Sequence, residues 1–130
     1  MVIVQAGRVA LIKRVRAGRT YYLFPGGGVE EGETPEQAAI REAHEELGVE
    51  VELGEPRYEE DFDRSRFVYF DARIVGGEFG TGLWPDHADR DANARERSGT
   101  HEPVWVPLEE LAGLDGLDIR PRALVKILTS

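Results

Sequence analysis

The sequence predicts an α/β (α+β) fold, because segments with the pattern of strands alternate with segments that have the pattern of helices. The strand-like segments are rich in branched and aromatic residues, and the clearest helical segment, over 35–47, is flanked by residues that begin and end helices. The chain has 130 residues, of which 41% are apolar, and this is enough to form one buried core. We therefore predict a single domain over 1–130.

The first strand is expected over 9–15, where branched residues alternate after a turn at Ala6-Gly7. A shorter apolar run at 21–24 ends in the glycine-rich segment 25–28, where the backbone can approach a ligand closely. The remaining elements are expected as strands at 49–53, 66–75 and 103–107, a long loop at 76–101 and a closing helix at 121–128.

The helix over 35–47 has recognisable signals at both ends. Thr34 can cap its first turn, Pro35 suits the first helical position, and Gln37 completes a T-x-x-Q capping box. Gly48 is typical of the residue that ends a helix. These local signals predict both boundaries of the helix.

The same helix has an acidic side. On a helical wheel centred on Ile40, Ala43 and Leu47 form the apolar side. Three carboxylates fall on the opposite side, where neighbours lie about 5–6 Å apart, and these are Glu42, Glu45 and Glu46. One interpretation is an ordinary solvated face, since Glu is a good helix former. The other is a site for Mg²⁺ or Mn²⁺, which prefer carboxylate oxygens and water as ligands.

The charge of the chain is distributed unevenly. It carries 25 acidic and 16 basic residues, a net charge of −9, yet residues 1–29 hold five basic side chains and no acidic one. Residues 30–63 hold 14 acidic side chains against two arginines. An acidic protein is a poor ligand for a polyanionic duplex, so stable nucleic-acid binding is not expected, whereas a small phosphate ligand is compatible with the basic start.

Other classes are excluded by composition. The sequence contains no cysteine, so it forms no disulfide and no cysteine-ligated metal site. A run of about 18 apolar residues, the length needed to cross a bilayer, is absent from the sequence, and no membrane partner is expected. Because the first residues have no pattern of a secretory leader, we expect a cytoplasmic protein.

From Gly27 to Val49 the chain matches the pattern G-x5-E-x7-R-E-U-x-E-E-x-G-U, where U is an apolar residue. This segment resembles the Nudix box, and all seven fixed positions are present; a smaller residue, Ala43, stands at the first U. The segments 23–27 and 105–111 are similar to further segments that are common in this family. The chain is therefore identified as a MutT-like member of the Nudix hydrolase family.

The resemblance implies a fold and a chemistry. The fold is an α/β/α sandwich with a mixed β-sheet and a loop–helix–loop catalytic motif. The activity is that of a pyrophosphatase, which hydrolyses a nucleoside diphosphate linked to another group X with the help of Mg²⁺, or of Mn²⁺ in its place. The implied metal ligands are Glu42, Glu45, Glu46 and the carbonyl of Gly26.

The resemblance also implies two other roles within the motif. The residue in the place of Glu42 is often the base that activates water, although the base differs between members of the family. Glu33 and Arg41 resemble the pair that orients the carboxylates, since a guanidinium can hold two carboxylates in fixed planes. The same pair is also interpretable as a structural salt bridge.

Weaker candidates lie outside the motif. Glu102 is a candidate metal ligand or base, against the alternative of an exposed acid at a strand end. The basic residues near the start are candidate contacts of substrate phosphates, against a solvated face, and Tyr22, Tyr21 or Trp84 could stack on a base, against a place in the core. The basic candidates are Arg14, Arg16 and Arg19.

A Nudix-fold module that binds a nucleotide without cleaving it is the alternative function, but the intact set of glutamates favours the enzyme. The expected partner is a small nucleoside diphosphate derivative, and a homodimer is left open. Oxidised deoxynucleotides, ADP-ribose, nucleotide sugars and dinucleoside polyphosphates are all open as substrates.

Overall fold

The computed structural model describes residues 1–26, 28–62, 64–81, 100–112 and 118–129. In these residues, strands are joined into one mixed sheet with the order β4-β5-β1-β2-β3-β7, and β6 pairs with β2. The β1–β5 and β3–β7 pairs are parallel, and the other pairs are antiparallel. The strands are β1 (Val2–Gln5), β2 (Arg8–Arg16), β3 (Arg19–Leu23), β4 (Val49–Phe62), β5 (Ser65–Gly77), β6 (Thr100–Pro107) and β7 (Ile119–Arg120).

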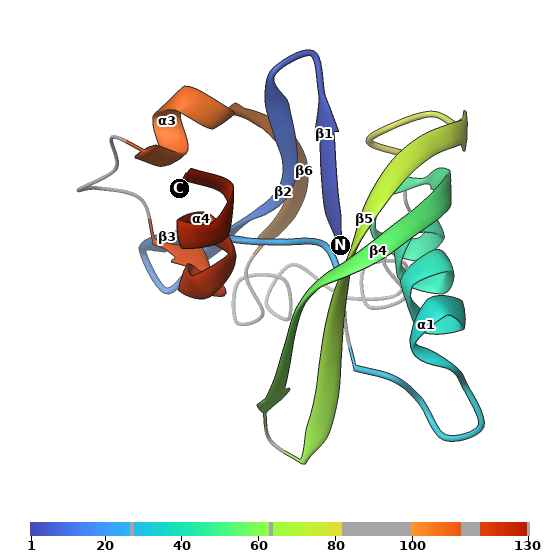
Figure 1. Cartoon of the computed structure of the whole chain (residues 1–130). Helices are drawn as coiled ribbons and strands as arrows, with labels where there is room; N and C mark the ends of the chain where they lie inside the picture. Colours follow the sequence, from blue (N-terminus) through green and yellow to red (C-terminus); the bar gives the residue numbers. More distant parts are fainter. Residues whose placement is uncertain (27, 63, 82–99, 113–117, 130) are drawn as a thin grey trace.

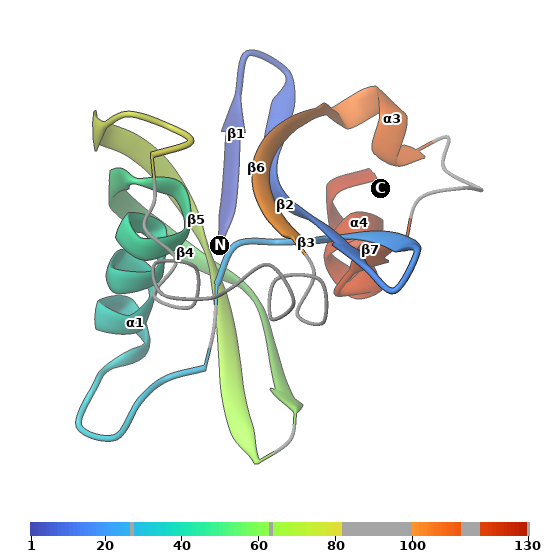
Figure 2. The same ribbon diagram turned by 180° about the vertical axis from the view of Figure 1, so that it is seen from behind.

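The helices cover the sheet from two sides. Helix α1 (Pro35–Glu42) continues into a π-helical turn, η1 (Ala43–Leu47), and lies beside β4 and β5. Helices α3 (Leu108–Ala112) and α4 (Arg122–Thr129) lie together on the other side, as both views show (Figures 1 and 2). The predicted α/β/α sandwich with a mixed sheet is confirmed.

Alternation along the central strands explains the two layers of core. On β2, Val9 and Leu11 belong to the apolar cluster that includes residues of α3 and α4. Ala10 and Ile12 point the other way, into the cluster formed with Ala43, Leu47 and other residues. Successive residues of a strand face opposite sides of the sheet, so one apolar strand supplies both cores.

The strands predicted at 9–15, 49–53, 66–75 and 103–107 are present, and each is longer than expected. The strand expected at 49–53 continues to Phe62, through Gly54 and Pro56. Its register against β5 shifts on both sides of Pro56. Since β4 is at the edge of the sheet, it tolerates a residue that cannot donate a backbone hydrogen bond.

Three elements lack a strong local signal, and the sequence did not predict them: β1, β7 and α3. Strand β7 has two residues and is held by its parallel pairing with β3, which sequence periodicity cannot reveal. The predicted closing helix is confirmed as α4. Residues 82–99 of the expected loop, including Trp84, lie outside the described residues.

The predicted helix has the expected ends but a different buried side. Thr34 caps it with the complete capping box, and Gly48 ends it in the left-handed conformation with φ 77°. However, Ile40 is 48% exposed, whereas Ala39, Ala43 and Leu47 are buried. The wheel centred on Ile40 was therefore wrong by about one residue step of roughly 100°.

This rotation changes the environment of one glutamate. Glu46 was expected on the side opposite to the core, but only 7% of it is exposed. It shares the buried side with Ala43 and Leu47.

In the described part of the chain, no helix has both the length and the apolar content required to cross a bilayer.

Candidate active site

Arg41 gathers carboxylates from two segments. Its Nε donates to Oε2 of Glu33 at 2.8 Å and its Nη2 to Oε1 of the same residue at 3.1 Å. Its Nη1 donates to Glu42 at 3.0 Å and to Glu45 at 3.2 Å. The predicted contact of Glu33 with Arg41 is thus present, and through Arg41 it fixes two of the three glutamates of the helix.

Local structure places Glu33 for this contact. Its Oε1 also accepts a hydrogen bond from the backbone N–H of Glu30 at 3.0 Å. The hydrogen bond from Arg41 is the main reason why the pKa of Glu33 is lowered, and the bond from Glu30 adds to it. The hydrogen bond to Glu33 is likewise the main reason why the pKa of Arg41 is raised, so the contact favours the charged forms of both side chains.

Glu46 is the buried member of the acidic set. Its Oε2 accepts a hydrogen bond from the backbone N–H of Gly26 at 3.2 Å. Burial raises the pKa of Glu46, and contact with the carboxylate of Glu42 raises it further. Two carboxylates that share a poorly hydrated site favour one proton, or one cation, between them.

Gly26 brings the loop before α1 close to this carboxylate. Its φ of +144° is rarely adopted by residues with a side chain, and a Cβ added here would lie 3.4 Å from the nitrogen of Met1. That nitrogen donates to the carbonyl of Pro25. A glycine is therefore required for the close approach of the loop to Glu46.

The oxygen atoms of the acidic set are chemically suited to bind a hard divalent cation. The set consists of carboxylate oxygens, one of them on a buried side chain that lacks a cationic side chain among its hydrogen-bond partners in the described residues. In the same part of the chain, no three acidic or histidine side chains converge in a ligand geometry. In this structure Glu42 and Glu45 bind Arg41, and Glu46 accepts a hydrogen bond from Gly26. The residue types fit a cation, and its ligand set stays a prediction.

Glu102 does not meet the glutamates of the helix. It is exposed on β6, directly opposite Lys13 of β2. Among the described residues, no hydrogen bond or ion pair joins it to Glu42, Glu45 or Glu46. Its proposed metal role stays a prediction.

The predicted basic candidates, with Tyr21 and Tyr22, lie on the β2–β3 hairpin. Arg16 and Arg19 face each other across its tip, and Arg14 pairs with Tyr21. The guanidinium of Arg14 lies 5.7 Å from the centre of the Tyr21 ring. Tyr22 packs against the core cluster, which agrees with the alternative that this ring belongs to the core.

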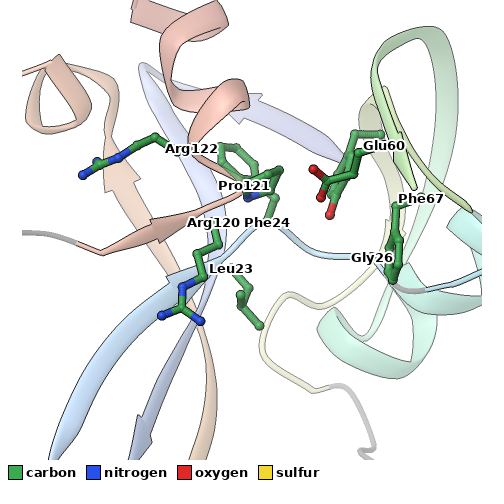
Figure 3. Close-up of a pocket in the computed structure, with 9 residues that line it drawn as sticks. Leu23, Phe24, Gly26, Glu60, Phe67, Arg120, Pro121 and Arg122 are labelled. Carbon is green, nitrogen blue, oxygen red and sulfur yellow. The ribbon is translucent and has the colours of Figure 1, made fainter. Parts of the chain in front are cut away.

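A pocket opens beside Gly26 and therefore beside the acidic set. Its volume is about 550 Å³, within the range of roughly 300–1,000 Å³ that small-molecule sites occupy. Figure 3 shows its lining, which comes from segments far apart in the sequence. The lining residues are Leu23, Phe24, Gly26, Glu60, Phe67, Tyr69, Arg120, Pro121 and Arg122.

Most of these lining residues have no signal in the sequence. Glu60 lies in a part of β4 that was not predicted as strand, and Arg120 lies in β7, which has only two residues. Only the β3–β7 pairing brings Arg120 next to Leu23. Gly26 was the one predicted site residue that lines the pocket.

The fold and the acidic helix together define a carboxylate-rich α/β/α domain with a ligand pocket at the start of its motif. The family model of the NUDIX domain matches residues 1–126. The chain belongs to the Nudix family.

Individual similarities agree with this assignment. The chain is 54% identical over 37 residues, or 28% of its length, to an RNA pyrophosphohydrolase of Pseudoalteromonas translucida, and the match spans 22% of that relative. The curated relatives are thus matched over only about a quarter of their length or less.

Solved structures show the same fold. A NUDIX-family hydrolase from Clostridium perfringens has a TM-score of 0.66 and 20% identity, covering 98% of this chain and 89% of that one. A MutT NUDIX hydrolase from Burkholderia pseudomallei has a TM-score of 0.64 and 23% identity, covering 99% and 93%. At these identities the likeness establishes the fold alone.

Proposed function

We propose that this protein is a metal-dependent pyrophosphohydrolase, which cleaves the diphosphate linkage of a nucleoside diphosphate joined to another group X. One observation carries the proposal: Arg41 holds the carboxylates of Glu33, Glu42 and Glu45, and Glu42 in turn contacts the buried carboxylate of Glu46. Like charges that are held together at such a cost are typical of a functional site.

Glu42, Glu45 and Glu46, with the carbonyl of Gly26, would hold the cation. Mg²⁺, or Mn²⁺ in its place, would neutralise the anionic oxygens of the diphosphate and lower the pKa of a water molecule. The carboxylate of Glu42 would accept the proton of the attacking water. The water oxygen bonds to one phosphorus, the bond from that phosphorus to the bridging oxygen breaks, and two phosphate-terminated products leave.

Glu33 and Arg41 are positioning residues in this proposal. Arg41 binds Glu33 in a bidentate manner and uses its remaining nitrogen for Glu42 and Glu45. A planar guanidinium fixes the planes of the carboxylates that it binds. A salt bridge that orients ligands is also a structural salt bridge, so the two interpretations of this pair are compatible.

The substrate is not identified by the relatives. The curated proteins that match a short part of this chain carry the name RNA pyrophosphohydrolase, and RNA therefore joins the candidates to be tested. The cytoplasmic location and the homodimer stay predictions.

Hydrolysis of a panel of nucleoside diphosphate derivatives and RNA, measured with Mg²⁺ and with Mn²⁺, tests the proposal. Glu46→Gln should lower kcat by at least 100-fold, since it removes a charge from the cation site. Glu36→Gln is the matched control, because Glu36 lies on the same helix but is exposed. Binding of one of the compounds without product release would instead favour the nucleotide-binding module.

A further inference from the structure

Glu60 is the acidic residue of the pocket wall that the proposed chemistry does not use. It lies on β4 directly opposite Phe67 of β5, and both line the pocket. Figure 3 shows its carboxylate directed toward the side that Phe24 and Pro121 form. A carboxylate in this place is available to a ligand that enters the pocket.

The contacts of the neighbouring residues on β4 leave the carboxylate of Glu60 available to bind a ligand. Glu59 and Asp61 alternate to the other face, where Arg66 pairs with both of them. Glu60 accepts a hydrogen bond from the hydroxyl of Tyr58 at 3.1 Å. No arginine or lysine among the described residues forms an ion pair with it. An ionised carboxylate has about four acceptor positions, so most of its acceptor capacity is unused.

The rest of the pocket suits a flat, aromatic ligand. Phe24, Phe67 and Tyr69 line it, and since Phe24 and Tyr69 are buried, the half-buried ring of Phe67 is the one expected to stack on the face of a nucleobase. Tyr69 lies 3.9 Å from the position of a Cβ on Gly26. Burial, followed by the charges of Glu60, Tyr58 and Glu46, raises the pKa of Tyr69 to about 12. The pocket lining includes both Glu60 and Gly26, and the N–H of Gly26 binds Glu46 of the acidic set.

We infer that Glu60 forms hydrogen bonds with the nucleobase of the substrate and selects guanine. The inference rests on the proposed function, because that function requires a nucleoside at the pocket beside Gly26. A carboxylate accepts hydrogen bonds and donates none. Guanine presents two adjacent N–H donors, N1–H and the N2 amino group, which match its two oxygens. Adenine and cytosine place a ring acceptor beside their amino group, and uracil flanks its single N–H with two carbonyls, so each of them sets an acceptor against the carboxylate.

Binding of GMP, AMP, CMP and UMP, measured by calorimetry with Mg²⁺, tests this without any need for turnover. The unmodified protein should bind GMP at least 10-fold more tightly than AMP, since a bidentate base contact discriminates by about 1–3 kcal/mol and 1.4 kcal/mol is tenfold. Glu60→Gln should weaken GMP binding about 10-fold or more. It should also strengthen AMP binding, because an amide offers adenine one acceptor and one donor.

Two further variants complete the experiment. Glu59→Gln is the matched control and should leave all four affinities unchanged, because Glu59 faces away from the pocket and pairs with Arg66. Tyr58→Phe keeps the charge of Glu60 but removes the hydrogen bond that orients it. It should weaken GMP binding by about threefold to fivefold, consistent with the loss of one net hydrogen bond, with no effect on UMP.

Equal affinity of the unmodified protein for the four nucleotides would overturn the inference. The inference would also be overturned if Glu60→Gln weakened the binding of all four nucleotides equally but left the binding of the 2′-deoxynucleotides unchanged. That result would assign Glu60 to a contact with the ribose. A preference for GMP in a protein that hydrolyses nothing would leave this inference standing and reject the proposed function. Hydrolysis together with equal affinity for the four nucleotides would support the proposed function and reject this inference.

Discussion

The backbone N–H of Gly26 donates to Oε2 of Glu46 over 3.2 Å, and this bond ties the loop before α1 to the buried carboxylate of the helix. Glu46 is only 7% exposed, and apart from the N–H of Gly26 its carboxylate contacts Glu42, a second acid. A single backbone donor compensates only part of the cost of burying an ionised group. The metal-free site is therefore a weak point in the stability of the fold.

Glu46→Gln should stabilise the protein when divalent cations are removed. The amide keeps an oxygen for the N–H of Gly26, and it requires neither a buried charge nor the uptake of a proton on folding, so we expect the free energy of unfolding in EDTA to rise by about 1–3 kcal/mol. The unmodified protein should gain stability on addition of Mg²⁺, whereas the variant should gain little.

Chemical denaturation at neutral pH, with EDTA and with Mg²⁺, provides the measurement. Glu36→Gln, an exposed change on the same helix, should change stability by less than about 0.5 kcal/mol in either condition. A metal-free Glu46→Gln variant less stable than the unmodified protein would show that the charge of Glu46 contributes to the fold.

Arg41→Lys should impair the binding of the cation more than the binding of the substrate. Lysine keeps the charge but cannot reproduce the bidentate contact with Glu33 while also reaching Glu42. Changes to residues that orient ligands typically cost 10- to 100-fold in metal affinity or activity. We therefore expect the Mg²⁺ concentration at half-maximal rate to rise about 10-fold or more, with KM changed by less than about threefold.

Arg57→Lys is the control for this variant. Arg57 forms a comparable contact with Asp71, at 3.0 Å to both carboxylate oxygens, but on the exposed face of β4 and β5. It should leave the Mg²⁺ dependence unchanged. An equal shift in both variants would assign the effect to general loss of stability.

How far the sequence could predict this site depends on the range of the interactions involved. Thr34, Gln37 and Gly48 act on backbone groups within a few residues, so the ends of the helix were predicted correctly. Which side of the helix is buried depends on the sheet beneath it. Ala39 is 8% exposed and Ile40 is 48% exposed, because the small side chain permits the closer approach to the sheet. Hydrophobicity alone ranks these two residues in the wrong order.

The pocket was beyond prediction for a different reason. Glu60 becomes a pocket residue through its register with Phe67 in a long hairpin, and Arg120 through a parallel pairing of two residues. Neither arrangement has a pattern of its own in the sequence. The motif could be recognised because its residues are close along the chain, whereas the part of the site expected to determine specificity is assembled from distant strands.

Gly77→Ala should destabilise the end of the helix that carries the glutamates. Gly77 has φ +79°, and a Cβ on it would meet the carbonyl of Gly48 and lie 2.8 Å from Cα of Val49. Backbone strain and overlap with main-chain atoms act together, so we expect a loss of about 3 kcal/mol or more in the free energy of unfolding.

Gly7→Ala separates the two causes. Gly7 has a similar φ of +76°, but nothing lies within 4 Å of a Cβ added there. Its loss should therefore be only about 1 kcal/mol, from backbone strain alone. Urea denaturation of both variants gives the comparison, and equal losses would mean that the contact with Gly48 relaxes without cost.

Arg122→Ala and Arg16→Ala test which basic residues attract the phosphates of the substrate. Arg122 lines the pocket at the start of α4, whereas Arg16 lies at the tip of the β2–β3 hairpin opposite Arg19. Loss of one exposed cation near a phosphate should raise KM about 3- to 10-fold, with the effect reduced at high salt, so we expect this result for Arg122→Ala. Arg16→Ala should change KM by less than about twofold. The measurement is KM at low and at high ionic strength. If Arg16→Ala raised KM more than Arg122→Ala, the phosphates would bind at the hairpin, and the substrate would extend from the pocket toward it.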